Sequence, residues 1–359
     1  MESAPQSTTL PPTMRAWVRR RRGPPATSLE LADVPVPPTP PGSSADVLIR
    51  VSHVSLQFNS PFFISTLPSL PFTGPWIPEL EFSGEVVAAG TGAPPEVRDP
   101  GTQVVAFSNV PGTVLKGQGV LCEYVRVPGG NVTRIPETMD MAAASGINGC
   151  GSTAVKMIRT SGVSPGHTVL VNGASGSVGS VLVQMLKMRG ARVVAIASGG
   201  NEELVRGLGA DEFVDYKSHD SLPAFLATEY GEQPFDFVFD CVGTQALFAN
   251  SPAYLKPEGA VINIGAIEGI WSTTLGILSN WFLPTWLGGV PRRYIVFSTP
   301  PTRMATIHVV DLIEKRGLRV SVDSVFDMEN ALDAYVRIAT KRARGKVVVK
   351  VCRDDGANI

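Results

Sequence analysis

The sequence predicts an α/β protein in which a doubly wound parallel sheet accompanies a second, β-rich domain. Two observations predict this fold class. Residues 140–300 alternate short apolar runs, rich in β-branched residues, with helical patterns, as parallel β–α units do. Residues 13–139 instead contain short apolar runs that Pro and Gly interrupt, which favours a distorted barrel. Residues 1–12 are polar and rich in Pro, so we expect them to be disordered.

The most informative segment predicts a strand, a glycine turn and a helix, in that order. Thr168–Val171 has the pattern of a buried strand, and Gly173, Gly176 and Gly179 follow at three-residue spacing. Such glycines allow a tight turn, close approach of a pyrophosphate to the backbone, and close packing of the next helix. The N-terminus of that helix presents N–H groups to the phosphates. The predicted dinucleotide-binding turn comprises Gly173, Ala174, Ser175, Gly176, Ser177, Val178 and Gly179.

Four further strand patterns complete the predicted sheet. They cover residues 192–197, 212–216, 235–242 and 260–265. The carboxyl ends of parallel strands meet at one edge of a doubly wound sheet, and ligands bind there. Asn263 and Gly265 end the fifth strand, so we expect both to lie near the nicotinamide.

The second strand indicates which nicotinamide cofactor the chain prefers. An NAD site usually places Asp or Glu at the end of this strand, where the carboxylate binds the ribose hydroxyls. Here the strand runs into Ser198-Gly-Gly-Asn201, without a carboxylate. Ser198 and Asn201 can donate hydrogen bonds to a 2′-phosphate. The sequence therefore favours NADP over NAD.

Composition excludes some classes of partner and compartment. The chain has 359 residues and a net charge of −1, so no strong overall field attracts nucleic acid. Its four cysteines form no C-x-x-C pair, which favours a reducing compartment over a disulfide framework. The first dozen residues do not resemble a presequence. We therefore expect a cytoplasmic protein.

Several motifs occur in an order and spacing that one family shares. They are Met14-Arg-Ala-Trp17, Asp33-Val-Pro-Val-Pro37, Val47–Val51, Phe82–Val87, Leu208-Gly-Ala-Asp-Glu212, Phe239-Asp-Cys-Val-Gly243 and Arg344–Val349. With them the chain resembles the zinc-independent medium-chain dehydrogenases/reductases of the quinone oxidoreductase and enoyl reductase type. The resemblance implies a Rossmann-type dinucleotide domain at 140–300. It also implies a discontinuous GroES-like domain at 13–139 and 301–359, with nicotinamide and substrate between the two domains.

The resemblance also implies roles for individual residues. Tyr216 matches a position that reaches the 2′-phosphate, and Thr153, Phe297 and Lys346 match positions around the cofactor. Zinc-free relatives often carry Asn and Tyr in the stretch matching residues 57–62. Here that stretch contains Gln57 and Phe62, which we assign to the substrate pocket. Because the usual Tyr is a Phe, no catalytic residue is assigned, and solvent is expected to protonate the product.

The same comparison predicts that the chain holds no metal. Zinc-dependent relatives place a Cys soon after the strand matching Val47–Val51, where this chain has Gln57. They also carry a Gly-His-Glu where this chain has Pro78–Gly84, which contains no His. Without zinc to polarise an alcohol, we expect hydride transfer from NADPH to an already electrophilic enone, enoyl thioester or quinone.

An uncharged segment, Gly269–Pro291, contains three Trp residues, and Pro284 and Gly288-Gly289 interrupt it. A transmembrane span is disfavoured because the segment lies between two strands of one sheet. We expect a lid or pocket wall over a bulky apolar substrate, which assigns Trp281 and Trp286 to the substrate pocket. Peripheral contact with a membrane surface remains an alternative.

Two alternative functions stay open, and so does the oligomeric state of the chain. One is a trans-acting enoyl reductase of a polyketide pathway, whose substrate is carried by a partner protein. The other is a non-catalytic NADPH-binding adaptor or sensor. In the leading interpretation the partner is a small hydrophobic substrate, and a homodimer is an open possibility.

Overall fold

The computed structural model describes residues 10–67, 76–108, 112–113, 117–298 and 300–352. Two compact units form, Met1–Asn148 with Val322–Ile359, and Gly149–Ser321. The predicted disordered stretch 1–12 lies mostly outside the described residues. The predicted α/β fold, with a doubly wound parallel sheet and a separate β-rich part, is confirmed.

In the part of the second unit that is described, six parallel strands form one sheet in the order β10-β9-β8-β11-β12-β13. The strands are β8 (Thr168–Asn172), β9 (Arg192–Ala197), β10 (Glu212–Asp215), β11 (Phe235–Asp240), β12 (Leu255–Asn263) and β13 (Arg293–Val296). The chain reverses its direction of strand addition between β8 and β11. This reversal is the point at which doubly wound sheets bind ligands at their carboxyl edge.

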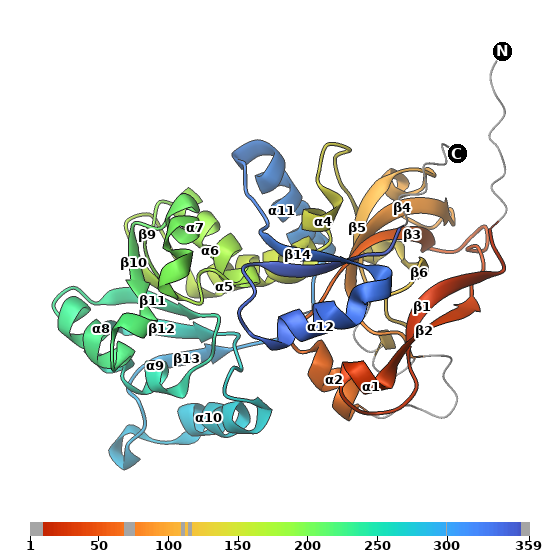
Figure 1. Ribbon diagram of the computed structural model, residues 1–359. Coiled ribbons are helices and arrows are strands. Elements are labelled where there is room, and N and C mark those ends of the chain that lie inside the picture. Colours follow the sequence, from red (N-terminus) through yellow and green to blue (C-terminus); the bar gives the residue numbers. More distant parts are fainter. Residues whose placement is uncertain (1–9, 68–75, 109–111, 114–116, 299, 353–359) are drawn as a thin grey trace. The chain divides into compact units, whose positions relative to one another are not determined.

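Helices cover both faces of this sheet (Figure 1). They are α5 (Ser152–Ser161), α6 (Ser177–Met188), α7 (Glu202–Gly207), α8 (Leu222–Tyr230), α9 (Gln245–Ala249) and α10 (Ile270–Phe282), and a further helix, α11 (Arg303–Arg316), packs on α5. Leu226 of α8 and Phe248 of α9 pack in one buried cluster with Leu170 and Val238 of the central strands. Burial of these apolar side chains stabilises the unit.

The first unit is built mainly from antiparallel strands. A two-stranded sheet pairs β1 (Thr13–Arg19) with β2 (Leu29–Pro35). A larger sheet has the order β14-β15-β3-β4-β5-β7, and β6 pairs with β3. Its strands are β3 (Asp46–Ser55), β4 (Glu81–Ala89), β5 (Gln103–Phe107), β6 (Tyr124–Pro128), β7 (Val132–Arg134), β14 (Val322–Asp327) and β15 (Lys346–Lys350). Its helices are α1 (Pro25–Ser28), α2 (Ser60–Thr66), α4 (Met141–Ala144) and α12 (Ala331–Ala339).

The units divide at different residues from the predicted domain boundaries at 139 and 300. Helix α11 lies in the second unit. It packs on α5, and a Cβ atom added to Gly151 would lie within 2.8 Å of the Val309 side chain. That close contact explains why 301–321 remains with the dinucleotide unit. Of the described residues after α11, 322–352 return to the β-rich unit and contain β14, α12 and β15.

Candidate dinucleotide-binding site

The glycine turn lies between β8 and α6, as the sequence predicts. Gly173 has a φ of +80°, a left-handed conformation that disfavours side chains. A Cβ atom on Gly179 would lie 2.2 Å from the Gly173 carbonyl oxygen, so this position admits no side chain. Gly176 is different, because a Cβ there would meet only that same oxygen, at 3.3 Å. The open side of Gly176 and the N-terminus of α6 form a cradle that fits a pyrophosphate.

A buried carboxylate joins the two strands at the reversal point. Asp240, at the end of β11, accepts a hydrogen bond from Asn172 Nδ2 at the end of β8, at 2.9 Å. It also accepts the N–H groups of residues 242, 243 and 244. Burial raises the pKa of Asp240, and these donors oppose that shift. Asp240 therefore shapes the loop next to the glycine turn. In the sequence, Asp240 stands out only as part of the family motif Phe239-Asp-Cys-Val-Gly243.

The loops that follow β11 and β12 touch through two glycines. A Cβ on Gly243 would lie 2.2 Å from the Gly265 carbonyl oxygen, and one on Gly265 would lie 2.1 Å from the Val242 backbone. Asn263 is buried and accepts the Gly265 N–H at 2.8 Å, and its amide donates to Tyr294 Oη at 2.8 Å. Asn263 thus acts on the site by shaping the turn at Gly265.

The predicted ribose-phosphate residues lie together. Asn201, in the turn η4 (Gly199–Asn201), donates through Nδ2 to Ser198 Oγ and Ser175 Oγ, both at 3.0 Å. Each hydroxyl accepts from the amide, so its own hydrogen is available for a ligand oxygen. Asn201 Oδ1 is buried and has no hydrogen-bond partner among the described residues. An unpaired buried acceptor beside two hydroxyl donors fits the ribose end of a dinucleotide.

The structure adds a carboxylate to this turn that the sequence analysis missed. Asp215, which ends β10, accepts hydrogen bonds from Lys217 N at 3.0 Å and Ser218 Oγ at 3.2 Å. The Lys217 N–H and, less strongly, the Gly199 N–H lower the pKa of Asp215, so it stays ionised. A Cβ on Gly199 would lie only 2.4 Å from its Oδ2 atom. The segment 198–201 lacks a carboxylate of its own, but the neighbouring strand supplies one nearby.

Tyr216 begins the turn η5 (Tyr216–Ser218) directly after Asp215 and is 46% exposed. The Lys217 ammonium lies 5.9 Å from the centre of the Tyr216 ring. An exposed phenol and an ammonium therefore stand next to the Asp215 carboxylate. The lysine is a cation that the sequence analysis did not assign. The signal in the sequence was the position of Lys217 just after a predicted strand, at the edge of the sheet where ligands bind.

The remaining predicted cofactor residues lie in different places. Thr153 is in the first turn of α5, next to Ser152, whose Oγ is buried without a partner among the described residues. Phe297 is half-buried and directly follows β13. Lys346 lies in the first unit, where its buried ammonium contacts Glu81 Oε1. The cofactor role of these three residues stays a prediction.

Gln57, predicted for the substrate pocket, belongs to a buried polar cluster of the first unit. Its Nε2 donates to Glu81 Oε1 at 2.5 Å, and its backbone N–H donates to Glu79 Oε2 at 3.0 Å. Glu79 also accepts from Ser60 Oγ at 2.8 Å and Tyr335 Oη at 2.7 Å. Burial raises the pKa of Glu79 to about 7, against the opposing effect of these donors and of Lys346.

The other three predicted substrate-pocket residues are exposed. Phe62 lies on α2 with 43% of its surface exposed. Trp281 on α10 and Trp286 in the turn η7 (Thr285–Leu287) are 53% and 80% exposed. Trp281 Nε1 donates to the Tyr294 carbonyl of β13 at 3.4 Å. Their assignment to a substrate pocket stays a prediction.

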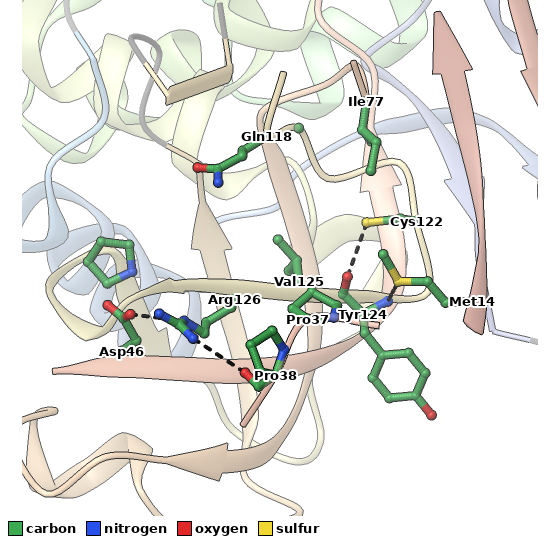
Figure 2. Close-up of a pocket in the computed structure, with 12 residues that line it drawn as sticks. Met14, Pro37, Pro38, Asp46, Ile77, Gln118, Cys122, Tyr124, Val125 and Arg126 are labelled. Atoms are coloured by element: carbon green, nitrogen blue, oxygen red, sulfur yellow. Dashed lines mark hydrogen bonds and ion pairs between the residues drawn. The ribbon is translucent and has the colours of Figure 1, made fainter. Parts of the chain in front are cut away.

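A hollow of about 480 Å³ lies elsewhere in the first unit (Figure 2). Pro37, Pro38 and Cys122 line it, together with the ion pair of Arg126 and Asp46. Cys122 Sγ is 3.2 Å from the Tyr124 carbonyl oxygen, and burial raises the pKa of the thiol to about 12. A thiol held in this state is not a nucleophile at neutral pH. None of the predicted site residues lines this hollow.

No cluster of three or more His, Cys, Asp or Glu side chains suited to a metal ion occurs in the part of the chain that the structure describes. The described residues fit a dinucleotide better. Gly176 provides the open cradle, Ser175 and Ser198 provide donors, and Asn201 and Ser152 carry unpaired buried oxygens.

Comparison with known proteins identifies the same kind of enzyme. Residues 208–349 match the family model described as a zinc-binding dehydrogenase. The chain is 44% identical to the medium chain reductase pydE of an Acremonium species, over 94% of this chain and 99% of that protein. It is 33% identical to the trans-enoyl reductase poxH of Penicillium oxalicum, over 94% of this chain and 98% of that one.

Solved structures show the same fold. The quinone oxidoreductase of Coxiella burnetii matches with a TM-score of 0.76 at 24% identity, over 95% of this chain and all of that one. The match to the dehydrogenase model covers residues 208–349. It therefore does not extend over Gln57 or Pro78–Gly84, the two regions compared above with zinc ligands. Members of the family bind nicotinamide cofactors, and the glycine turn of this chain has the geometry for one. The chain is therefore an oxidoreductase of the medium-chain dehydrogenase/reductase family, related to a medium chain reductase and a trans-enoyl reductase.

Proposed function

We propose that the chain uses NADPH to reduce a carbon–carbon double bond conjugated to a carbonyl group, in a small hydrophobic substrate, with quinones as alternative acceptors. The cofactor supplies the hydride. The observation that carries the proposal is the Ser175–Asn201–Ser198 arrangement, in which two hydroxyl donors converge at the end of β9. Such donors suit the 2′-phosphate of NADPH. Tyr216 and Lys217 stand at the next strand end, where the Lys217 charge offsets that of the neighbouring Asp215.

The chain's own residues would act mainly by binding and positioning. The open side of Gly176 and the N–H groups of α6 would hold the pyrophosphate. Asn263 would keep the Gly265 turn in place beside the nicotinamide. Gln57 stands where zinc-dependent relatives have a Cys ligand, and its side chain is hydrogen-bonded to Glu81. We infer that an activated acceptor, rather than an alcohol, is the substrate.

A trans-acting enoyl reductase of a polyketide pathway is the more specific candidate. Its support is the identity to poxH, a protein named as a trans-enoyl reductase, across 94% of the chain. In that case the enoyl group would arrive on a carrier protein rather than as a free thioester. We further propose a cytoplasmic setting, in keeping with four cysteines that are all free.

The test is NADPH oxidation by the purified chain. The substrates are an enoyl N-acetylcysteamine thioester, the same acyl group on a carrier protein, and phenanthrenequinone. We expect turnover of an enoyl substrate, at least about tenfold faster with NADPH than with NADH at limiting cofactor, a difference of about 1.4 kcal/mol. One or two hydrogen bonds to the phosphate can supply that difference.

The Ser198→Asp variant should reverse the cofactor preference, whereas Ser43→Asp, on an exposed residue of the first unit, should not. Turnover of the carrier-bound substrate alone would select the trans-acting candidate. Binding of NADPH without oxidation by any of the acceptors would point to the adaptor or sensor instead. Equal rates with the two cofactors would contradict the NADPH assignment.

A further inference from the structure

Helix α10 carries its apolar face outward. Trp271, Leu275, Leu278 and Phe282 are 81%, 68%, 47% and 73% exposed. Their spacing of four, three and four residues places them in a single stripe along the helix. A surface helix of a globular protein normally turns such a stripe toward the core. The polarity of α10 is therefore inverted.

The face of α10 that packs on its own unit carries the polar side chains of Thr273 and Asn280, beside Gly276 and Ile277. Asn280 and Gln245 of α9 exchange two side-chain hydrogen bonds, at 2.7 and 3.0 Å. Gly276 approaches the same Gln245, so that an added Cβ would lie 2.9 Å from its Oε1 atom. The Trp281 indole donates a hydrogen bond to the backbone of β13. Figure 1 shows α10 beside this strand. These contacts hold the helix in place with its stripe outward.

The apolar surface continues beyond the helix into the turn η7. Leu283, Trp286 and Leu287 are 42%, 80% and 56% exposed. The turn is ordered by hydrogen bonds from the N–H groups of Leu287 and Gly289 to the Pro284 carbonyl, at 3.0 and 2.9 Å. The stripe and the turn form one surface, which we call the α10–η7 surface. A continuous run of exposed apolar side chains of this kind marks a docking site.

The charges around the α10–η7 surface indicate what covers it. Residues 269–291 include no charged side chain, and the next two residues are Arg292 and Arg293. Arg292 is held by the carbonyls of Leu255 and Pro252, at 3.0 and 3.2 Å, and Arg293 is exposed. Glu268, at the other end, accepts the Gln245 N–H at 3.0 Å. The turn η7 thus has an uncharged tip that carries Trp286, and two arginines follow it in the chain.

We propose that the α10–η7 surface docks on the surface of an anionic lipid bilayer, with the η7 tip inserted among the headgroups. Trp, Leu and Phe are the side chains that partition into this interface, and the nearby arginines match anionic headgroups. Helix α10 has 13 residues and is about 20 Å long, shorter than the roughly 30 Å hydrocarbon core. In the described residues, no helix is long and apolar enough to cross a membrane. The helix therefore lies on the bilayer, and this docking does not depend on the proposed reaction.

The experiment is co-sedimentation of the full chain with vesicles of phosphatidylcholine alone and with one quarter phosphatidylserine. Wild type should bind the anionic vesicles. Replacing Trp271 and Trp286 with Ser should weaken binding at least about tenfold. Arg293→Gln should weaken binding to anionic vesicles alone, by about fivefold. The matched control replaces Met304 and Val336 with Ser, since these apolar residues are 75% and 62% exposed elsewhere.

Brominated lipids provide a second readout. Trp17 and Trp76 are buried, so quenching of fluorescence would report on Trp271, Trp281 and Trp286. We expect quenching with wild type and its loss in the double Trp variant. The proposal fails if wild type binds neither kind of vesicle. It also fails if wild type is a dimer that does not bind vesicles and that the same substitutions dissociate, because a second copy then covers the surface.

Discussion

At the scale of single residues, buried carboxyl groups hold together segments that are far apart in the sequence. Asp240 joins β8 to β11, and Glu79 joins the start of α2 to Tyr335 of α12. Glu79 adopts a φ of 69°, a left-handed conformation that is unfavourable for a residue with a side chain. Its three hydrogen bonds must offset both this conformation and the cost of burying the carboxyl group.

The raised pKa of Glu79 predicts how stability varies with pH. The folded-state pKa is about 7, and the ordinary pKa of a Glu side chain is 4.5. Between these values the folded chain holds a proton that the unfolded chain has lost. Stability should therefore fall as pH rises from about 4.5 to 7, by about 3 kcal/mol in total, and then level off. The groups that face Glu79 are Tyr335, Ser60, Gln57 and Lys346.

Urea denaturation of the chain at several pH values checks this prediction. Glu79→Gln should remove most of the dependence between pH 4.5 and 7. Glu137→Gln, on an exposed carboxylate of the same unit, should leave it unchanged. The same slope in wild type and in Glu79→Gln would show that another group titrates, and would contradict the raised pKa.

At the scale of elements, the β8–α6 turn offers a matched pair of glycine substitutions. A side chain at Gly176 meets one carbonyl oxygen, at 3.3 Å, and otherwise enters open space. Gly176→Asp should therefore fold, and its carboxylate should occupy the pyrophosphate cradle and repel it. At Gly179 an added Cβ would lie 2.2 Å from the Gly173 carbonyl. Gly179→Ala should instead lower the stability of the second unit.

Circular dichroism melts and fluorescence titration with NADPH separate the two effects. We expect Gly176→Asp to melt within a few degrees of wild type and to lose at least about a hundredfold in affinity, about 2.7 kcal/mol. Gly176→Ala is the control for size without charge and should keep most of the affinity. A folded Gly176→Asp variant that still binds NADPH tightly would show that the phosphates lie elsewhere.

The turn was predictable from the sequence because its signals are local. Strand, glycine spacing and helix all fall between Thr168 and Met188, and each has a simple steric cause. Asp215 and Asp240 belong to the same site, but the contacts of Asp240 with Asn172 of β8 and of Asp215 with Gly199 after β9 join neighbouring strands. Which strands are neighbours depends on the winding of the whole sheet. The sequence pattern of α11 indicates a helix, but it does not indicate that Val309 packs on Gly151. For this reason the sequence places α11 in the wrong unit.

At the scale of the whole molecule, the predicted cofactor residues concentrate in one unit. The turns at 173–179, 198–201 and 216–218 all follow strands of the same parallel sheet. The predicted substrate residues Gln57 and Phe62 belong to the other unit. The sequence predicted both sets through motifs and resemblance. It could not show that Gln57 is bonded to Glu79 and Glu81, because these partners lie 22 and 24 residues away in the sequence.

Cofactor binding should therefore protect one unit more than the other against hydrogen exchange. A ligand at one hundred times its Kd stabilises the state that binds it by about 2.7 kcal/mol. With NADPH, we expect exchange to slow at residues 173–179, 198–201 and 216–218. Exchange in the β1–β2 sheet of the first unit should change little. Mass spectrometry of the exchanged chain, with Gly176→Asp as the control that does not bind, measures both. Slowing in β1–β2 with no change at these three turns would move the dinucleotide site away from the carboxyl edge of the parallel sheet.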